Sequence, residues 1–306
     1  MRDQFIEQLR KRAVEDPRIM LVTGDLGFAV FNQYREDCPI QFLNAGVAEQ
    51  NMTAVATGLA MEDRIVFTYS IGNFSTLRCL EQIRNDACYH NADVKVVSIG
   101  GGFSYGSLGI SHHATEDLAI MRSLPNMTVV SPCGLWETKM VTDAIIDTPG
   151  TFFLRLDKSF GNDEPLEKDE IFQLGRARIL REGTDVSILV TGGILEEVQK
   201  AADILESEGV SVQIVSVHTI KPFDVDLVLE VARKTKNVVT VEEHTVFGGL
   251  GSAVAEALLD NGVHPKRFLR IGLEAGFSSI VGSQEYLRQQ YGLDAFAISE
   301  KIRTLI

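Results

Sequence analysis

The chain has 306 residues, a length that suggests about two domains. Apolar residues make up 45% and charged residues 23%, as in an ordinary globular protein, and no apolar run approaches the roughly 20 residues of a membrane span. The 29 basic residues against 42 acidic ones give a net charge of -13, which argues against nucleic acid or anionic lipid as a general partner.

The N-terminal segment and the cysteines indicate a cytoplasmic protein. Residues 1–17 predict an amphipathic helix with mixed acids and bases, so a secretory signal is not expected. The cysteines are scattered and form no C-x-x-C pair, which is typical of reduced thiols and not of a zinc or redox motif. We therefore expect no metal site within this chain.

Short apolar runs alternate with helical patterns through the first half of the chain. The expected strands are 19–22, 40–43, 65–67, 94–99, 128–130 and 151–154, and the expected helices are 50–61, 75–90, 115–123 and 134–147. Such alternation predicts an α/β fold, with a parallel sheet covered by helices on both faces.

A second, smaller α/β unit follows a polar stretch. The segment 159–170 is acidic and contains Pro165, which suits a linker. The strand and helix patterns then restart, with strands expected at 186–190, 211–215 and 237–241, helices at 195–207 and 252–259, and a loop at 219–224. We therefore predict a first domain at 1–165, a linker at 166–183 and a second domain at 184–306, within the usual size range of domains.

Glu49 is the most informative residue of the first domain. It stands at the start of the expected helix 50–61, whose residues are apolar or small on nearly every face, so this helix is expected to be buried. A carboxylate there must be paired, hydrogen-bonded to free helix N–H groups, or protonated because of desolvation. Two interpretations follow: a helix cap, which is the commoner role, or an acid that takes part in chemistry.

The loop after the strand 94–99 also carries candidate residues. It begins with Gly100-Gly101-Gly102, at the edge where open α/β sheets place ligands, and continues to His112 and His113. Histidines there are candidate proton-transfer groups near neutral pH, although a loop histidine is more often a hydrogen-bonding or surface residue. Neighbouring histidines do not face one way, so they are a poor metal site. Arg155 and Lys158 either hold an anionic group or form a solvated strand end.

Five stretches of the chain carry a family resemblance. They read AGVAEQNMTAVATGLA, FSTLRCLEQIRN, SHHATEDLAIMRSLPNMTVVSP, and SVHTIKPFD with VEEHTVFGGLG. With these stretches the chain resembles the C-terminal half of transketolase, in the form where this thiamine-diphosphate-dependent enzyme is split into two polypeptides. The resemblance implies a pyrimidine-binding domain followed by a smaller transketolase C-terminal domain.

The resemblance also implies a cofactor pocket. Glu49 matches the glutamate that hydrogen-bonds the ring nitrogen of the aminopyrimidine, and a buried carboxyl that favours its protonated form can share a proton with that ring. Phe74 matches the aromatic side chain that stacks on the pyrimidine. Tyr69 and Ile71 would line the same pocket, and Asp25 would lie near the cofactor. Relatives often carry Phe where Ile71 stands, so the aromatic wall is expected to be thinner here.

Substrate residues follow from the same resemblance. His112 matches a histidine that faces the oxygens of the donor sugar, with His113 beside it. Arg155 and Lys158 fall near basic positions that hold the acceptor phosphate in relatives. Many transketolases carry an acidic residue, which recognises a donor hydroxyl, at the position of Leu108. A missing hydrogen bond at a specificity site weakens discrimination strongly, so an unusual sugar or a 2-oxo acid donor stays open.

The family binds diphosphate and Mg²⁺ through a G-D-G motif and a later Asn on a separate domain, and this chain has no full match. The resemblance therefore implies a partner of about equal size, the N-terminal transketolase subunit, in an α2β2 heterotetramer with sites at the subunit interfaces. The expected activity is transfer of a two-carbon ketol unit from a ketose, commonly a sugar phosphate, to an aldose. The alternatives are the β subunit of a 2-oxo acid dehydrogenase, a deoxyxylulose-phosphate-synthase-like acyloin-forming enzyme, and a non-catalytic scaffold subunit.

Overall fold

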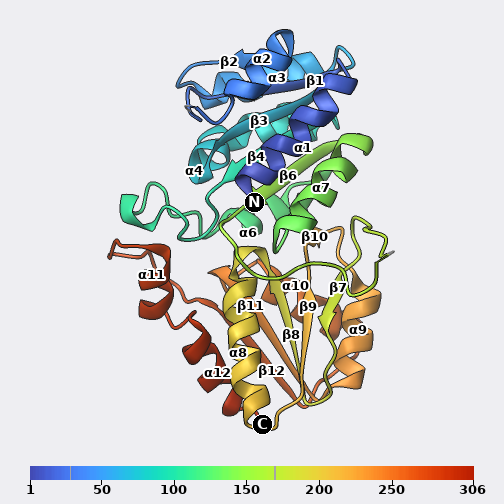
Figure 1. Ribbon diagram of the computed structural model, residues 1–306, viewed down its shortest axis with the longest axis vertical. Helices are drawn as coiled ribbons and strands as arrows, with labels where there is room; N and C mark the ends of the chain where they lie inside the picture. Colours follow the sequence, from blue (N-terminus) through green and yellow to red (C-terminus); the bar gives the residue numbers. More distant parts are fainter. Residues whose placement is uncertain (28, 169) are drawn as a thin grey trace.

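A computed structural model describes residues 1–27, 29–168 and 170–306, which form two α/β domains stacked along the long axis of the molecule (Figure 1). Within these residues the first domain has a seven-stranded sheet in the order β10-β5-β6-β4-β3-β1-β2, and the second has a five-stranded sheet in the order β12-β11-β8-β9-β7. The N-terminus lies near the boundary between the domains and the C-terminus at the far end of the second (Figure 1).

The first domain alternates strands and helices as expected. Its strands are β1 (Ile19–Thr23), β2 (Phe42–Asn44), β3 (Ile65–Ile71), β4 (Val94–Ile99), β5 (Met127–Val130) and β6 (Thr151–Leu156). Its helices are α1 (Arg2–Glu15), α2 (Asn32–Asp37), α3 (Glu49–Ala60), α4 (Gly72–Ser75), α5 (Leu80–Gln82), α6 (Asp117–Ser123) and α7 (Leu135–Asp147). The single helix expected at 75–90 is instead a run of short segments that ends in a π-helical stretch at Ile83–Cys88.

The second domain contains further elements that local patterns did not reveal. Its strands are β7 (Arg178–Arg181), β8 (Val186–Thr191), β9 (Val212–Ser216), β11 (Asn237–Thr245) and β12 (Arg267–Leu273), and β10 (Thr219–Lys221) belongs to the same part of the chain. Its helices are α8 (Leu195–Ser207), α9 (Val225–Lys234), α10 (Leu250–Asp260), α11 (Gln284–Gln290) and α12 (Ala295–Arg303).

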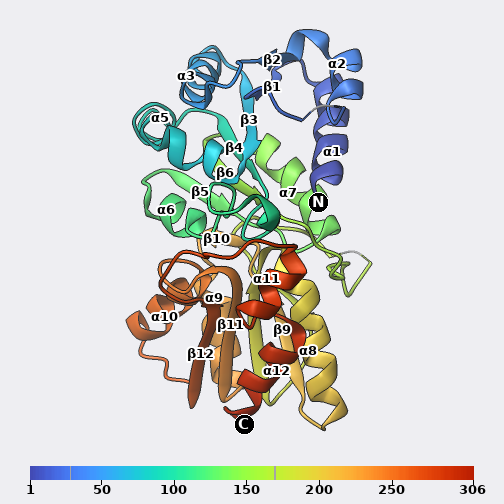
Figure 2. The same ribbon diagram turned by 90° about the vertical axis from the view of Figure 1, so that its left-hand side faces the viewer.

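Helices cover both faces of the first sheet. Figure 2 shows α3, α5 and α6 on one side of the strands and α1 and α7 on the other. The central strands β4 and β6 are buried along their whole length, which explains their continuous apolar runs. Side chains alternate along a strand, so each one belongs to a single face of the sheet. The side chains of β3 are therefore divided between the face covered by α3 and the face covered by α1.

The two domains are joined more closely than their separate patterns suggest. β10, in the expected loop 219–224, pairs antiparallel with β5 and so extends the sheet of the first domain. β7 lies inside the expected linker 166–183 and pairs antiparallel with β9. The linker between the two folded units is therefore shorter than predicted, because three or four residues are too few to show a strand period.

The helix α3 is only half-buried, contrary to the expectation of a fully buried helix. Met52, Thr53, Ala56 and Thr57 face the core, whereas small residues such as Ala54 face outward and are exposed. The exposed residues of this helix are Gln50, Asn51, Ala54 and Gly58, which are polar or small. Glu49 lies on the buried face, at its N-terminal end.

Two properties of the whole chain agree with the sequence analysis. Cys38, Cys79, Cys88 and Cys133 are buried free thiols. Across the described ranges, no helix combines the length and the apolar character that crossing a membrane requires.

Candidate active site

The candidate site lies at the carboxyl edge of the first sheet. Glu49 is the first residue of α3, Phe74 lies in α4 directly after β3, and His112 lies in the loop that follows β4. The strands β1, β2, β3 and β4 are parallel, so the segments that follow them meet at one edge of the sheet. This placement brings together residues that are up to 63 positions apart in the sequence.

Glu49 is a buried carboxylate with a cationic partner. Its side chain is 3% exposed, and Oε2 accepts a hydrogen bond of 2.8 Å from Nη1 of Arg78. The N-cap of α3 is Ala48, and no side chain caps this helix. Glu49 is therefore not a helix cap, and its ion pair with Arg78 compensates part of the cost of burying a charge.

Arg78 is a residue that the sequence analysis missed. Its guanidinium lies 4.5 Å from the centre of the Phe74 ring, in a cation–π contact, while it also binds Glu49. The spacing from Phe74 did not reveal it, because Phe74 lies in α4 and Arg78 in a separate short helical turn, Leu77–Cys79. Arg78 thus connects the acid to the aromatic side chain.

His112 completes this group. Its ring centre lies 5.1 Å from that of Phe74, at an interplanar angle of 72°, and Nδ1 lies 2.9 Å from Oγ of Ser111. Partial burial lowers the pKa of His112 below its ordinary value, and the neighbouring His113 acts in the same direction, so the ring is neutral at neutral pH. Within the described residues Nε2 has no hydrogen-bond partner, and a substrate can therefore use it.

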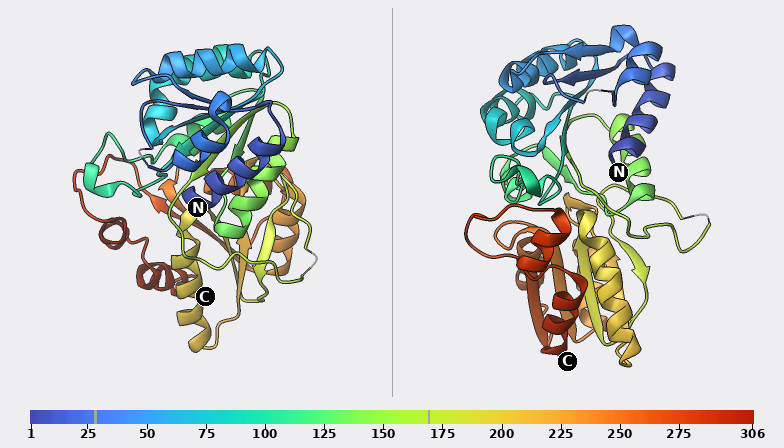
Figure 3. Two further views of the ribbon diagram at one scale, coloured as in Figure 1. Left: turned by 45° about the horizontal axis from the view of Figure 1, so that its top comes forward. Right: turned by 60° about the vertical axis from the view of Figure 1, so that its left-hand side comes forward.

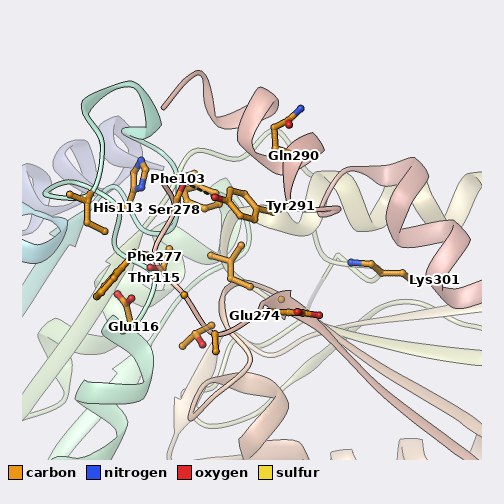
Figure 4. A pocket seen from close by; sticks show the side chains of 16 residues that line it. Phe103, His113, Thr115, Glu116, Glu274, Phe277, Ser278, Gln290, Tyr291 and Lys301 are labelled. Atoms are coloured by element: carbon orange, nitrogen blue, oxygen red, sulfur yellow. Dashed lines mark hydrogen bonds between the residues drawn. The ribbon is translucent and has the colours of Figure 1, made fainter. Parts of the chain in front are cut away.

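His113 points away from Phe74, as expected for adjacent residues. Its Nε2 donates to the carbonyl oxygen of Gly106 at 3.0 Å, and its ring packs edge-on against Phe103 at 5.0 Å. It lines a pocket of about 540 Å³ between the domains, whose wall also includes Glu116, Tyr291 and Lys301 (Figure 4). His112 therefore contacts Phe74, whereas His113 contacts Phe103 and the pocket between the domains.

Asp25 lies close to Glu49. A Cβ atom added to Gly24 would sit 3.4 Å from Cγ of Glu49, so the backbone just before Asp25 touches the acid. Asp25 is exposed and is held by Asn44, which accepts from its N–H at 3.0 Å and donates to its carboxylate at 2.9 Å. The segment after β1 is therefore part of the same edge.

Tyr69 lies elsewhere. Its side chain is 2% exposed and packs against Phe31 and Phe5, on the α1 and α7 face of the sheet. Ile71, two residues later, is half-buried and packs against the same cluster. Tyr69 and α3 are on opposite faces of the sheet, so Tyr69 belongs to the core, contrary to the expectation that it lines the cofactor pocket.

Arg155 and Lys158 have different surroundings. The Arg155 side chain is completely buried and donates four hydrogen bonds, to Asp117, Asp157 and two backbone carbonyl groups. Burial tends to lower its pKa, but its acidic neighbours outweigh this and raise the pKa above its ordinary value, so Arg155 stays charged. It has no surface for a substrate phosphate, contrary to the expected role.

Lys158 is exposed, and its Nζ lies 5.9 Å from the centre of the Tyr105 ring. It lines a second pocket, of about 460 Å³, together with Arg2, Ser104 and Tyr105. Asp3 and Asp157 also border this pocket, and Arg2 pairs with Asp3 at 2.7 Å, so an anionic group there would meet Lys158 as its main cation.

Leu108 is 55% exposed. Its loop lies beside the segment before α11, as both views of Figure 3 show, and Gly282 donates from its N–H to the carbonyl oxygen of Gly106 at 3.3 Å. The loop that carries His112, called the histidine loop below, therefore presents an exposed apolar side chain at Leu108.

Two family models match the chain: the pyrimidine-binding domain of transketolase over residues 1–162 and the C-terminal domain of transketolase over residues 175–298. The chain belongs to the transketolase family. The matched ranges correspond to the two domains of the structure, and the predicted α/β fold with the pyrimidine-binding domain first is confirmed.

Several relatives of this transketolase-family chain have about its own length. It is 37% identical to a "Putative transketolase C-terminal section" of Methanocaldococcus jannaschii, over 99% of this chain and 95% of that protein. It is 38% identical to a "6-deoxy-6-sulfo-D-fructose transketolase subunit" of Clostridium sp., over 96% of this chain and 91% of that protein. The solved structure of a "Split gene transketolase, inactive beta4 tetramer" superposes with a TM-score of 0.88 at 34% identity, over 99% and 97% of the two chains.

Proposed function

We propose that this chain is the C-terminal subunit of a split transketolase, which transfers a two-carbon ketol unit from a ketose to an aldose through thiamine diphosphate and Mg²⁺. The observation that carries this proposal is the buried carboxylate of Glu49, joined through Arg78 to the partly exposed ring of Phe74 and next to His112. A buried acid beside an accessible aromatic face fits the aminopyrimidine half of the cofactor.

Thiamine diphosphate, when bound, supplies the carbanion chemistry of the reaction. Glu49 would hold a proton at the ring nitrogen of the aminopyrimidine, and Phe74 would stack on the ring. Arg78 now occupies Oε2 of Glu49. Because Arg78 is half-exposed, it can turn toward solvent when the pyrimidine takes its place. The cation would therefore stabilise the buried acid until the cofactor binds.

His112 would hold and move a proton at a hydroxyl or carbonyl oxygen of the donor, because its ring is neutral and its Nε2 meets no partner in the part of the chain that the structure describes. Lys158 would hold an acceptor phosphate in the pocket that it borders. The open position of Leu108 would offer a donor no charged partner, which favours donors other than the usual ketose phosphates.

A partner subunit would complete the site. Val47 and Leu77 flank the Glu49–Arg78 pair in sequence and are 73% and 45% exposed, and exposed apolar side chains around a site are a mark of an interaction surface. Similar proteins carry the names of transketolase subunits, among them an apulose-4-phosphate transketolase subunit of Phocaeicola vulgatus, 33% identical over 96% of this chain and 93% of that protein. We propose an N-terminal subunit that holds Mg²⁺ and the diphosphate, in a cytoplasmic α2β2 heterotetramer.

Reconstitution tests the proposed function. We expect the chain mixed with its N-terminal partner to convert a ketose and an aldose phosphate into the exchanged pair, measured by chromatography of the products. The isolated chain should bind thiamine diphosphate poorly, because it holds only half of the site. Tight, Mg²⁺-dependent binding by the chain alone in a calorimeter, or no transfer by the assembled complex with any sugar donor, would contradict the proposal.

Replacement of Lys158 by Met should raise the KM for a phosphorylated acceptor about tenfold, the effect of losing one hydrogen bond to a charged group. The KM for the same aldose without phosphate should stay unchanged. Lys139→Met, an exposed lysine on α7, is the matched control and should leave both values unchanged. An equal effect of Lys158→Met on both acceptors would show that Lys158 does not hold the phosphate.

A second candidate is an acyloin-forming condensation with a 2-oxo acid donor. Leu108 favours it, because a 2-oxo acid lacks the hydroxyl that an acidic residue there would bind. The chain is also 34% identical to a "1-deoxy-D-xylulose-5-phosphate synthase 1" of Geobacter metallireducens, over 99% of this chain and 48% of that protein. Release of CO₂ from pyruvate by the assembled complex would select this reaction over ketol transfer.

A further inference from the structure

The second domain contacts the loop that carries His112. The N–H of Thr245, at the end of β11, donates to the carbonyl oxygen of Thr115 at 2.8 Å. The N–H of Phe103 donates to Oε1 of Glu243 at 2.5 Å. Paired backbone hydrogen bonds of 2.7 and 3.0 Å between Gly102 and Ala114 close the loop between these two contacts. The base of the histidine loop therefore rests on β11.

Glu243 is the centre of this contact. Its side chain is 2% exposed, and besides Phe103 it accepts hydrogen bonds from Arg288 at 2.5 Å and from Gln284 at 3.0 Å. A Cβ atom added to Gly102 would lie 2.4 Å from Oε1 of Glu243, so only glycine lets the loop approach this closely. The Glu243 carboxylate thus fixes the position of the loop backbone at Gly102 and Phe103 relative to β11.

Arg155 adds a bridge between the two domains. The same nitrogen, Nη2, donates to the carbonyl oxygen of Ala114 at 3.2 Å and to that of Glu243 at 3.0 Å. Ala114 is two residues from His112. A fully buried guanidinium with fixed acceptors has little freedom, so this bridge links the position of β11 to the position of the loop.

The opposite side of the loop is held by the candidate site itself. Nδ2 of Asn73 donates to the carbonyl oxygen of His113 at 2.9 Å, and Asn73 precedes Phe74. The histidine loop is therefore clamped between α4, which carries Phe74, and β11 of the second domain.

We infer that Glu243 is a positioning residue, through which the second domain holds the loop of His112 at the distance from Phe74 that the reaction needs. This role rests on the proposed function. It gives the second domain a part in the reaction although β11 contributes no group to the edge that carries Glu49.

The test replaces Glu243 by Gln in the assembled complex. Gln keeps the shape, but its single oxygen can accept from Phe103 or from Arg288 and not from both, so one of these two contacts is lost. We expect kcat to fall about 10- to 100-fold, as for a misplacement of about 1 Å, with KM changed less than twofold. If this variant does not fold, Glu243→Asp keeps the charge but withdraws it from Phe103, and the same fall is expected.

The neighbouring Glu242 provides a matched control. It is equally buried on β11, but its carboxylate accepts from the N–H groups of Leu250 and Gly251 at the start of α10. Glu242→Gln should therefore cost stability, measured by thermal unfolding, without lowering kcat. A comparable fall of kcat in Glu242→Gln and Glu243→Gln would mean that loss of stability explains both, and the inference would be wrong.

A double-mutant cycle with His112→Ala shows whether Glu243 acts through His112. If it does, Glu243→Gln should change the residual kcat of the His112→Ala complex by less than about twofold, the limit of additivity error for independent sites. The same 10- to 100-fold fall in both backgrounds would overturn the inference.

A spectroscopic readout separates this inference from the proposed function. In the isolated chain, the ring signals of His112 in an NMR spectrum, assigned with His112→Ala, should shift or broaden in Glu243→Gln and stay unchanged in Glu242→Gln. If the wild-type complex transfers no ketol unit, the proposed function fails, and the ring signals still decide about positioning. Unchanged His112 signals in Glu243→Gln would refute the positioning role of Glu243.

Discussion

Replacement of Glu49 by Gln in the assembled complex should lower the turnover number at least about 100-fold, the usual effect of losing an acid–base group. Gln keeps the size and a hydrogen bond but cannot give or take a proton. The fold should persist, because Arg78, which loses its charged partner, is half-exposed and can be hydrated. Steady-state kinetics of the reconstituted complex, with circular dichroism of the chain, measures both parts of this prediction.

Glu62→Gln is the matched control for Glu49, since it is an exposed glutamate just beyond the other end of α3. Its turnover should equal that of the wild type. An unchanged turnover of Glu49→Gln would contradict the proposed role of Glu49 and would favour a scaffold subunit that retained the fold.

Replacement of Arg155 by Met should lower the free energy of unfolding by about 3–5 kcal/mol, the range for breaking a buried ion pair from one side. Asp117 and Asp157 would remain, with side chains 0% and 3% exposed and no guanidinium beside them. Urea or thermal unfolding of the isolated chain measures the loss.

The loss should depend on pH in a defined direction. Burial already raises the pKa of Asp117 above its ordinary value, and without the Arg155 guanidinium this carboxyl should hold its proton to higher pH. A carboxyl whose pKa is raised by folding contributes less to stability as the pH rises. The deficit of Arg155→Met should therefore be largest at neutral pH and smaller in mildly acidic solution.

Arg12→Met is the control for a less buried ion pair. Arg12, on α1, pairs with Asp143 and Asp147 at the surface, and its loss should cost at most about 1 kcal/mol. A loss below about 1 kcal/mol for Arg155→Met as well would show that the buried ion pairs do not stabilise the fold.

Much of the fold was predictable because it is local. Apolar runs of four to six residues and helical periods placed β4, β6, β8, α7 and α8 within one or two residues. The strand β10 was not predictable, because three residues show no period and its partner β5 lies about 90 positions earlier in the chain. For the same reason the sequence did not reveal β7, which lies inside the expected linker 166–183.

Some residues of the candidate site were also predictable from the sequence, and others were not. Glu49 at the start of a helix and His112 in a loop after a strand follow from sequence, because each depends on its own segment. Tyr69 did not, because both faces of β3 are buried, and only the packing of α1 and α3 shows which of them meets the edge that carries Glu49.

The sequence by itself determined the order of the two domains, the alternation of strands and helices, and the family to which Glu49, Phe74 and His112 point. Only the tertiary structure decided that Arg78 pairs with Glu49, that Arg155 is buried and that Glu243 reaches the histidine loop. The reason is distance along the chain. Arg155 finds Asp117 at 38 positions and the backbone of Glu243 at 88, and a charged residue whose partners are that remote looks like a solvated strand end until the chain is folded.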